Sequence, residues 1–481
     1  MEFLDYLPIL PLVFLVVWAV VLLTVDLWIP KNRKDITAAL SAVGMVISLI
    51  LSLTRAGNIE PIFGGSIVVD GFATFLDAIF LFSGLAGIAL AYQYLKRMGI
   101  ERSEYYILLL ITISGMMLMS YAYDLMVVFI ALELLSLPLY ILTGFVRFNL
   151  RSEEAALKYF LLGAFSSGFV LYGVALIFGA TAHTDFGGIL SSASSGLLNK
   201  PLFITGAALL LVGFGFKSAL VPFHMWSPDV YQGAPSPVTA FMSVGAKAAG
   251  FAALLRVFIV AFPNLSADLV PLLWALAALT MVVGNVLAIS QTNIKRLLAY
   301  SSIAQSGYML MAFVPYASDK VRADTVAAML FYLAAYCIAS FGAWAVVISL
   351  EKKGEKGLNL DDFAGLGKRH PFLAAAMTVF MLSFTGVPLT LGFWGKFFLF
   401  STAVEGGYWG LALVGLLASL VSAYYYLRLV VIMYMRPGEA EAEGGILVNI
   451  TSLGCALAVV LLSFIPNALF YLAAQAILKV L

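Results

Sequence analysis

The sequence predicts an all-α, polytopic membrane protein with about fourteen transmembrane helices. Of its 481 residues, 62% are hydrophobic and only 11% are charged. Soluble domains have about 45–50% apolar and about 25% charged residues. Runs of about 20 apolar residues, the length that spans a bilayer, recur from one end of the chain to the other. No packed water-soluble core accounts for both observations.

The predicted segments fill residues 1–481, which we expect to form one transmembrane domain. The first segment should be retained rather than cleaved, because Glu2 and Asp5 stand where a signal peptide carries basic residues. The longest polar stretch, residues 351–370, is a connector. The segments lie near residues 6–29, 36–53, 70–94, 104–121, 124–146, 154–180, 201–221, 237–262, 268–290, 297–315, 324–350, 371–403, 408–434 and 446–474.

The loops between these segments carry most of their lysines and arginines on one side of the membrane. Because cytoplasmic loops are enriched in these residues, that side is predicted to be cytoplasmic and both termini to lie outside. The cytoplasmic set includes Lys31, Lys34, Arg97, Arg147, Lys295 and Lys352, and the smaller outer set includes Arg55, Lys200, Lys320 and Lys479.

A weak internal repeat aligns the segment AALKYFLLGAFSSGFVLYGVALI, which begins at Ala155, with AAMLFYLAAYCIASFGAWAVVIS, which begins at Ala327. Lys158 aligns with Leu330, although chance similarity between two Ala- and Phe-rich helices is an open alternative. Segments seven and twelve are both interrupted by Gly and Pro near a lysine, in GFGFKSALVPFH and GVPLTLGFWGKF. Paired interruptions are typical of inverted repeats with a site near the midplane.

Composition excludes several classes of chemistry. The chain has two cysteines and three histidines, whereas an iron–sulfur cluster needs about four thiolates. Cys337 and Cys455 lie in apolar runs and are expected to be buried as small apolar residues. Neither a dinucleotide-binding glycine motif nor a P-loop is present. The net charge of +1 gives no argument for nucleic acid. We therefore expect no cofactor in this chain.

Five of the ionisable residues inside the predicted segments are the main candidates for function. A charge at mid-bilayer costs about 3 kcal/mol on insertion scales, so such residues are functional candidates by default. A buried lysine suits proton transfer, because burial weakens its hold on the proton while a nearby carboxylate strengthens it. The five residues are Glu133, Lys158, Lys217, Lys247 and Lys396.

Structural explanations compete with a functional role for some of these residues. Glu133, followed by the helix-straining Pro138, could form a static ion pair with Lys217. Lys217 lies at a helix interruption, where broken ends expose carbonyls that an ammonium can meet. Lys396 follows Gly392 and Gly395 in the other interrupted segment. The small residues around Lys247 favour close helix packing, which does not explain the lysine itself.

Lys158 is the weakest of the lysines, because it could pair with Glu154 one turn earlier and extend to the interface. His224, in a proline-rich connector, is a candidate proton relay, and a hydrogen-bonded structural role is the alternative. Asp229 is expected to brace the same turn, whereas Arg256 should reach an interface from its helix end. Asp77 cannot be assigned a role from sequence.

Long blocks of the chain resemble the antiporter-like membrane subunits of respiratory complex I. They are FIALELLSLPLYILTGF, EEAALKYFLLGAFSSGFVLYGVALIFGATA, KSALVPFHMWSPDVYQGAPSPVTAFMSVGAKAAGFAALLR, NIKRLLAYSSIAQSGYML and FTGVPLTLGFWGKFFLF. The resemblance implies fourteen helices, with discontinuous helices seven and twelve. It also implies inverted repeats of helices four to eight, residues 104–262, and nine to thirteen, residues 268–434. The N-terminal helices, within residues 1–121, would overlap the first repeat in part, and a last helix at 446–474 would follow the second. The resemblance also implies a hydrophilic axis for protons, which matches Glu133, Lys158, Lys217, Lys247 and Lys396 in this sequence.

The resemblance further implies a proton-pumping subunit of an NADH–quinone oxidoreductase in the cell membrane. Flavin, iron–sulfur clusters and quinone would then be held by partner subunits, which include further antiporter-like membrane subunits. The alternatives are a subunit of a multi-subunit Na⁺/H⁺ antiporter or of a membrane-bound hydrogenase, a substrate transporter, and a scaffold subunit without proton transfer. The block EEAALKYFLLGAFSSGF favours complex I.

Overall fold

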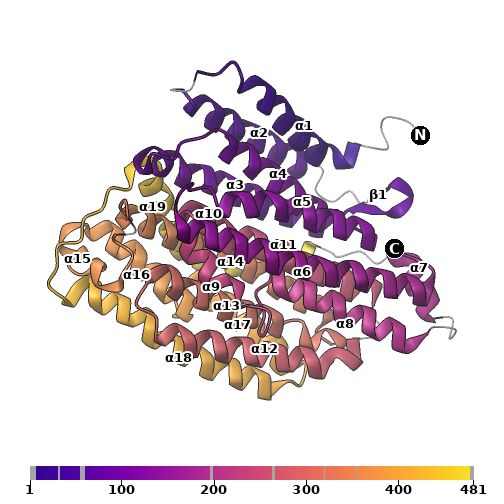
Figure 1. Ribbon diagram of the computed structural model, residues 1–481. Helices are drawn as coiled ribbons and strands as arrows, with labels where there is room; N and C mark the ends of the chain where they lie inside the picture. Colours follow the sequence, from indigo (N-terminus) through magenta and orange to yellow (C-terminus); the bar gives the residue numbers. More distant parts are fainter. Residues whose placement is uncertain are drawn as a thin grey trace.

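The computed structural model describes residues 7–30, 33–54, 60–194, 199–262, 266–318, 320–354 and 356–476. Within these residues, thirteen helices are long and apolar enough to cross a membrane. They lie side by side in one bundle, with their axes running mostly across the view of Figure 1. The predicted all-α membrane architecture is confirmed. The start of the first predicted segment and the loop cations Lys31, Arg55 and Lys479 lie outside the described residues.

The N-terminal quarter of the chain forms a layer at one edge of the bundle (Figure 1). A short antiparallel hairpin, which the sequence did not predict, precedes the third helix. The elements are α1 (Leu10–Val25), α2 (Asp35–Leu53), β1 (Glu60–Ile62), β2 (Ile67–Val69), α3 (Gly71–Met98) and α4 (Glu104–Tyr121).

The middle of the chain contains the first interrupted segment. The predicted segment 201–221 ends early, and a connector leads to a separate short helix. The elements are α5 (Leu125–Thr143), α6 (Leu150–Thr181), α7 (Phe186–Ser194), α8 (Lys200–Lys217), α9 (Trp226–Gly233), α10 (Ser236–Phe241), a π-helical turn (Met242–Ala246), α11 (Lys247–Leu255) and a second π-helical turn (Arg256–Ala261).

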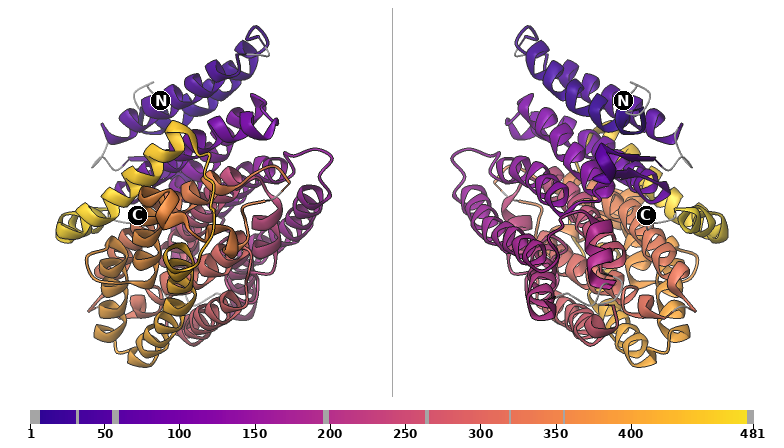
Figure 2. Two further views of the ribbon diagram at one scale, coloured as in Figure 1. Left: turned by 90° about the vertical axis from the view of Figure 1, so that its left-hand side faces the viewer. Right: turned by 90° about the vertical axis from the view of Figure 1, so that its right-hand side faces the viewer.

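The C-terminal part contains the second interrupted segment, because the predicted segment 371–403 is split in two. The elements are α12 (Ser266–Ile289), α13 (Ile294–Met311), α14 (Arg322–Leu350), α15 (Leu366–Arg369), α16 (Pro371–Thr385), α17 (Leu391–Glu405), α18 (Trp409–Met435), α19 (Gly445–Leu461) and α20 (Pro466–Gln475). In the end-on views, α6 and α8 lie on one side of the body and α16 to α18 on the other (Figure 2).

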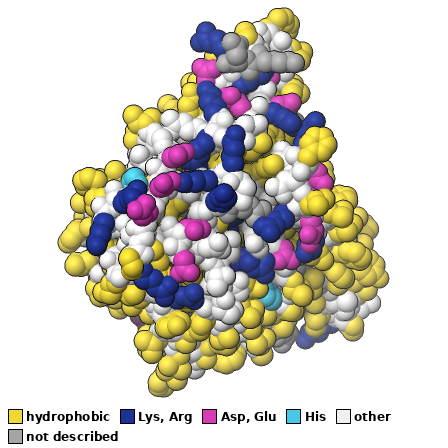
Figure 3. Space-filling view, turned by 60° about the vertical axis from the view of Figure 1, so that its left-hand side comes forward, with side chains coloured by type: hydrophobic (Ala, Val, Ile, Leu, Met, Phe, Trp, Pro, Cys, Tyr) yellow, Lys and Arg dark blue, Asp and Glu magenta, His cyan; other side chains and the backbone are white. Residues whose placement is uncertain are grey.

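Charged side chains gather at the end of the bundle that carries α15 and the connector 351–370. Figure 3 shows this face as a field of Lys, Arg, Asp and Glu bordered by hydrophobic side chains. It is the side that the sequence predicts to be cytoplasmic. One cation assigned to these loops is placed differently: Lys295 is only 2% exposed. Its ammonium donates to the carbonyl of Ala234 at 2.6 Å, inside the protein.

Both interrupted segments change direction through residues with positive φ. In the first, Ala219 has φ 54°, and in the second Gly386 and Leu389 have φ 89° and 68°. A positive φ ends a right-handed helix, because L-residues in that region cannot continue its hydrogen-bond pattern. The predicted helix breaks beside Lys217 and Lys396 are therefore present.

Candidate proton-transfer site

Three of the predicted lysines are buried in the interior of the bundle. Lys217, Lys247 and Lys396 are 3%, 2% and 3% exposed, respectively. We call these three residues the lysine row. None of them forms an ion pair with a carboxylate of the described residues, and each ammonium is held by neutral groups.

Lys217, the last residue of α8, lies among aromatic side chains. Its ammonium donates to the hydroxyl of Tyr159 at 3.3 Å. It also lies 5.4 and 5.1 Å from the ring centres of Tyr140 and Tyr159, within cation–π range. The expected ion pair with Glu133 is not formed, and among the described residues the ammonium has the Tyr159 hydroxyl as its hydrogen-bond partner. Neutral aromatic groups therefore hold the ammonium where we expected a carboxylate.

The expectation that broken-helix carbonyls hold Lys217 is wrong. The carbonyl of Phe216 accepts from the indole of Trp226 at 2.9 Å. The carbonyl of Gly215 accepts from the amide of Leu220 at 2.8 Å. The turn that ends α8 and the indole of α9 therefore satisfy the carbonyls that the sequence suggested for the lysine.

Lys247 lies at the junction of a π-helical turn and α11, facing α13. Its ammonium donates to the carbonyl of Ser302 at 2.7 Å, to the hydroxyl of Ser302, and to the hydroxyl of Ser306 at 3.3 Å. Gly250, one turn later, faces the break after α8: a Cβ there would lie 2.7 Å from Oγ of Ser218. The small residues around Lys247 thus bring α11 close to the Lys217 region, as packing by small residues predicts.

Lys396, in the second turn of α17, is held by the end of α16. Its ammonium donates to the carbonyl of Thr385 at 3.1 Å and to the hydroxyl of Ser419 at 2.8 Å. It also lies 4.4 Å from the ring centre of Tyr308. Gly386 leaves room for the Lys396 side chain, because a Cβ at position 386 would lie 3.0 Å from Cδ of Lys396. Here the end of a broken helix supplies a carbonyl to the ammonium, the arrangement that was expected for Lys217.

Glu133 lies on α5 at the boundary between the buried and the exposed face of the helix. Its side chain is half-buried, and Oε1 is buried without a hydrogen-bond partner. Ile130 and Leu137, one turn before and after it, are 55% and 50% exposed. Glu133 therefore lies beside the outward apolar face of α5 while part of its carboxylate points inward.

Lys158 is placed unlike the three lysines of the row. Its side chain is 43% exposed and pairs with Glu154 at 2.7 Å, as the sequence predicted, and also with Asp229 at 2.9 Å. Asp229 pairs in turn with Arg296 at 2.7 Å. Asp229 thus links α6, α9 and α13. Glu154, Lys158 and Asp229 line a cavity of about 230 Å³ at the charged end of the bundle.

His224 lies in the connector between α8 and α9 and is half-buried. Its Nδ1 has no hydrogen-bond partner within the described part of the chain. The structure therefore brings His224 near the break that follows Lys217, and it does not place it in the lysine row.

Arg256 does not reach an interface as the sequence suggested. It is fully buried and forms a two-pronged pair with Asp70, at 2.7 and 2.6 Å. Its Nε donates to the carbonyl of Ser120 at 2.8 Å. The reason is that Asp70, distant in the sequence, caps the start of α3 beside the end of α11 and supplies a buried counter-ion.

Polar residues of α13 that sequence reasoning overlooked lie between Lys247 and Lys396. The amide nitrogen of Gln305 donates to the carbonyl of Phe384 at 3.3 Å and contacts the hydroxyl of Tyr426 at 3.2 Å. The amide oxygen of Gln305 accepts from the hydroxyl of Tyr332. Phe384 directly precedes Thr385, whose carbonyl binds Lys396.

The sequence contains a signal for this polar face. The segment SSIAQSGY places two serines, a glutamine and a further serine inside an otherwise apolar predicted helix. Spacings of three and four residues put such positions on neighbouring rows of one helix face. The serines that bind Lys247 and the glutamine near Lys396 come from this segment.

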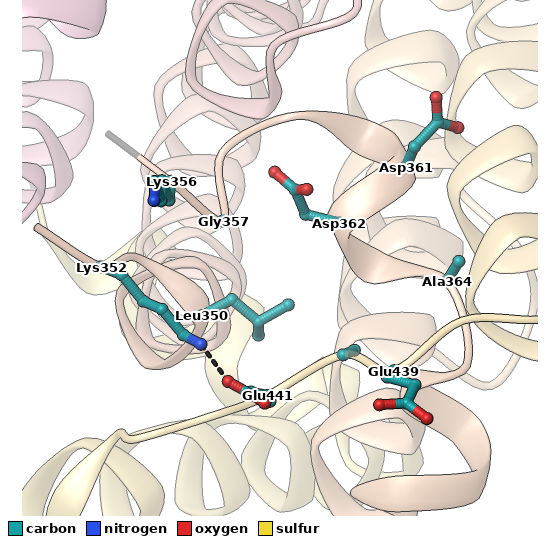
Figure 4. Close-up of a pocket in the computed structure, with 10 residues that line it drawn as sticks. Leu350, Lys352, Lys356, Gly357, Asp361, Asp362, Ala364, Glu439 and Glu441 are labelled. Carbon is teal, nitrogen blue, oxygen red and sulfur yellow. Dashed lines mark hydrogen bonds and ion pairs between the residues drawn. The ribbon is translucent and has the colours of Figure 1, made fainter. Parts of the chain in front are cut away.

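A separate polar cavity of about 300 Å³ lies beside the connector 351–370 (Figure 4). Some of its charges are paired within the protein: Lys352 binds Glu441, and Asp361 binds Arg436 at 2.8 Å. The cavity therefore lies between the connector and the segment before α19, and these ion pairs hold the two segments together. Among the described residues, no group of three or more His, Cys, Asp and Glu could hold a metal ion.

Comparison with known proteins decides the family. The sequence model of the NADH:quinone oxidoreductase/Mrp antiporter transmembrane family matches residues 122–422. The chain belongs to this family. It is 48% identical over 436 residues to NADH-quinone oxidoreductase subunit N of Trichlorobacter lovleyi, covering 90% of this chain and 88% of the relative. It is 46% identical over 470 residues to subunit N of Chloroflexus aggregans, covering 96% and 95%.

Solved structures agree with this family. A chain of respiratory complex I from Thermus thermophilus matches with a TM-score of 0.83 and 36% identity, covering 96% of this chain and 99% of that chain. A chain of the Mrp complex from a Dietzia species matches with a TM-score of 0.87 at 18% identity, covering 99% and 97%, which shows the shared fold alone. The predicted resemblance to antiporter-like complex I subunits, and to subunit N in particular, is confirmed.

Proposed function

We propose that this chain works as a proton-translocating membrane subunit of an NADH–quinone oxidoreductase. Its family membership and its similarity to subunit N of other bacteria support this function. Electron transfer from NADH to quinone would take place in partner subunits that hold the flavin, the iron–sulfur clusters and the quinone. This chain would contribute proton movement across the bacterial inner membrane, with both termini on the outer side.

The lysine row carries the proposal. Each ammonium is buried and held by hydroxyls, carbonyls or aromatic rings rather than by a carboxylate. A buried ammonium without a counter-charge gives up its proton at lower cost than one in a close ion pair. We propose that Lys217, Lys247 and Lys396 exchange protons in turn, and that Glu133 modulates Lys217 by its charge.

The access side would be formed by Lys158, Asp229 and His224. Lys158 and Asp229 line the cavity at the charged end of the bundle, and water can reach such a cavity. His224 follows Lys217 across the connector and has a free ring nitrogen within the described residues. An imidazole can accept and release protons near neutral pH. In this arrangement Lys158 acts at the mouth of the path rather than within it.

The polar face of α13 would connect the two halves of the path. Ser302 and Ser306 hold Lys247, and Gln305 on the same helix contacts the backbone beside the Lys396 site. Hydroxyl groups can both accept and donate a proton, whereas an amide positions its neighbours by hydrogen bonding. The step between Lys247 and Lys396 would therefore use hydroxyls and water rather than another charged residue.

We further propose that residues 104–262 and 268–434 are inverted repeats. The two interrupted segments support this arrangement, because each contains a proline and at least one residue with positive φ. The lysines occupy different positions relative to their breaks: Lys217 ends α8, whereas Lys396 lies within α17. Superposition of the two units in an experimental structure of the complex tests the proposal. An alignment that places the two lysines on unrelated helices would contradict it.

The function is tested by substituting Lys217 in the assembled complex. Lys217→Arg keeps a positive charge but arginine stays protonated in proteins. If proton exchange at this residue matters, Lys217→Arg should lose proton translocation about as severely as Lys217→Ala while assembling normally. The measurement is NADH-driven proton uptake by membrane vesicles, normalised to the amount of complex.

The matched control is Lys353→Ala, which removes an exposed lysine from the connector at the charged end. It should leave translocation at the wild-type level. Normal pumping by Lys217→Arg would reject proton exchange at this residue and leave a structural role. Translocation that requires Na⁺ would instead support the antiporter alternative.

A further inference from the structure

Asp77 is a buried carboxyl group that the lysine row does not use. It lies in α3, six residues after the first residue of that helix, which places it about 9 Å along the axis. Its side chain is fully buried, with 0% exposure. Sequence reasoning left this residue without a role.

Three helices enclose the Asp77 carboxyl. Oδ2 accepts a hydrogen bond from the hydroxyl of Ser52 on α2 at 2.8 Å and one from the hydroxyl of Tyr121 on α4 at 2.5 Å. Oδ1 is buried without a hydrogen-bond partner. Within the described ranges, no Lys, Arg or His nitrogen pairs with either oxygen. Among the described residues, Tyr121 is the titratable side chain that hydrogen-bonds to Asp77.

Asp70 offers a comparison within the same segment, seven residues earlier. It is equally buried, and Arg256 from the turn after α11 donates two hydrogen bonds to its carboxylate. Asp70 also accepts from the amide of Ala73 at 3.0 Å. The fold therefore provides a full counter-charge for one buried acid of this segment and two neutral hydroxyls for the other.

This difference determines the charge of Asp77. A carboxylate taken out of water is stabilised only by a cation or by several strong donors, and two hydroxyls do not replace its hydration. The protonated acid carries no charge, so it can remain buried at much lower cost. We propose that Asp77 is a proton-binding site that holds its proton at neutral pH, in a hydroxyl-lined pocket between α2, α3 and α4.

The Asp77 site differs from the lysine row in its position and in the charge of its protonated form. The lysines of the row are cationic when protonated, whereas Asp77 is neutral when protonated. Proton binding at Asp77 therefore stabilises the helix contacts around it. Its loss would leave an unpaired negative charge among α2, α3 and α4. The proposal does not depend on the route of translocated protons.

Infrared spectroscopy of the assembled complex tests the protonation state directly. The sample is labelled with carboxyl-¹³C aspartate, so that aspartate bands shift away from those of glutamate. The wild-type spectrum minus that of Asp77→Asn should contain the carbonyl band of a protonated acid at neutral pH. A difference spectrum that contains carboxylate bands instead would overturn the proposal. It would show that Asp77 is ionised, whether or not a cation such as Na⁺ is bound to it.

Assembly provides the second measurement. Asn has nearly the size of a neutral Asp and can accept the same two hydroxyl hydrogen bonds, so Asp77→Asn should assemble close to the wild-type level. Asp70→Asn is the matched variant. It leaves Arg256 without its counter-charge, and we expect a severe loss of assembled complex. Failure of Asp77→Asn to assemble, to the same extent as Asp70→Asn, would contradict a neutral Asp77.

Discussion

The ammonium of Lys396 donates a hydrogen bond to the carbonyl of Thr385, the last residue of α16, at 3.1 Å. The same carbonyl also accepts from the hydroxyl of Ser419 at 2.9 Å. The helix end is thus satisfied twice, once by the lysine and once by a neutral group. Removal of the lysine does not leave the carbonyl unpaired.

Lys396→Met should therefore separate function from folding. Methionine fills a similar volume, and Ser419 still satisfies the carbonyl of Thr385, so we expect normal assembly. Loss of a positioned proton-transfer group typically costs about 100-fold or more, so NADH-driven proton translocation should fall nearly to background. The readout is proton uptake by vesicles, with complex content measured by immunoblot. Full pumping by assembled Lys396→Met would remove Lys396 from the path.

Substitutions in the Arg256–Asp70 pair should impair assembly, in contrast to Lys396→Met. Breaking a buried ion pair by removing one partner costs about 3–5 kcal/mol, because the other charge is left uncompensated. Arg256→Met and Asp70→Asn should each reduce the amount of assembled complex strongly. The double variant should recover part of the loss, because no charge is left behind. Quantitative blots of the wild type, the two single variants and the double variant give the coupling energy between Arg256 and Asp70. Strictly additive losses would contradict a coupling between the two residues.

Runs of apolar residues were enough to predict the bundle, and the rare charges within them were enough to predict three of the residues that are buried in its interior. Lys217, Lys247 and Lys396 stand out because little else in these segments is ionisable. Their partners could not be predicted. Tyr140 and Tyr159 reach Lys217 from two other helices, and sequence alone gives no relative orientation of helices.

The wrong prediction for Arg256 and the missed hairpin also arise because local sequence does not reveal distant contacts. Arg256 lies near the end of a predicted segment, where an extended side chain usually reaches the interface. Its actual partner, Asp70, is 186 residues away in the sequence. The hairpin of β1 and β2 was missed because each strand has only three residues, too few for an alternating pattern. Local patterns thus predict elements, whereas long-range pairs require the three-dimensional structure.

A cluster centred on Asp26 should make the loop after α1 sensitive to acid. Lys34 pairs with Asp26 at 2.7 Å, and the hydroxyls of Thr37 and Ser103 also donate to its carboxylate. Burial alone would raise the pKa of Asp26, but these hydrogen bonds outweigh it and hold the pKa below its usual value. Because the folded pKa is depressed, the stabilisation is complete above the unfolded pKa of about 3.9 and is lost as the pH falls through the folded value.

Asp26→Asn should therefore loosen the ends of α1 and α2 at neutral pH, by about 1 kcal/mol for a partly exposed charged group. Hydrogen–deuterium exchange of peptides from this region measures the effect. The difference between wild type and variant should persist down to about pH 4 and close at lower pH. A gap of constant size across this range would show that the charge of Asp26 is not responsible.

The last prediction concerns the contact between Gln305 and Tyr332. The hydroxyl of Tyr332 donates to the amide oxygen of Gln305, whose nitrogen contacts the backbone beside the Lys396 site. If this contact orders the step between Lys247 and Lys396, Tyr332→Phe and Gln305→Leu should reduce proton translocation by roughly tenfold or more, while the complex assembles. Gln305→Glu keeps an acceptor for Tyr332 and should retain more activity than Gln305→Leu.

Tyr105→Phe is the matched control for the loss of a buried hydroxyl. Tyr105 is fully buried, and its hydroxyl has no hydrogen-bond partner in the described part of the chain. Its substitution changes the packing volume as Tyr332→Phe does, but it leaves α13 untouched, so translocation should be unchanged. Equal effects of the two substitutions would indicate a general response to core changes. Wild-type translocation by assembled Gln305→Leu would exclude the polar face of α13 from the route, because leucine can neither donate to Phe384 nor accept from Tyr332.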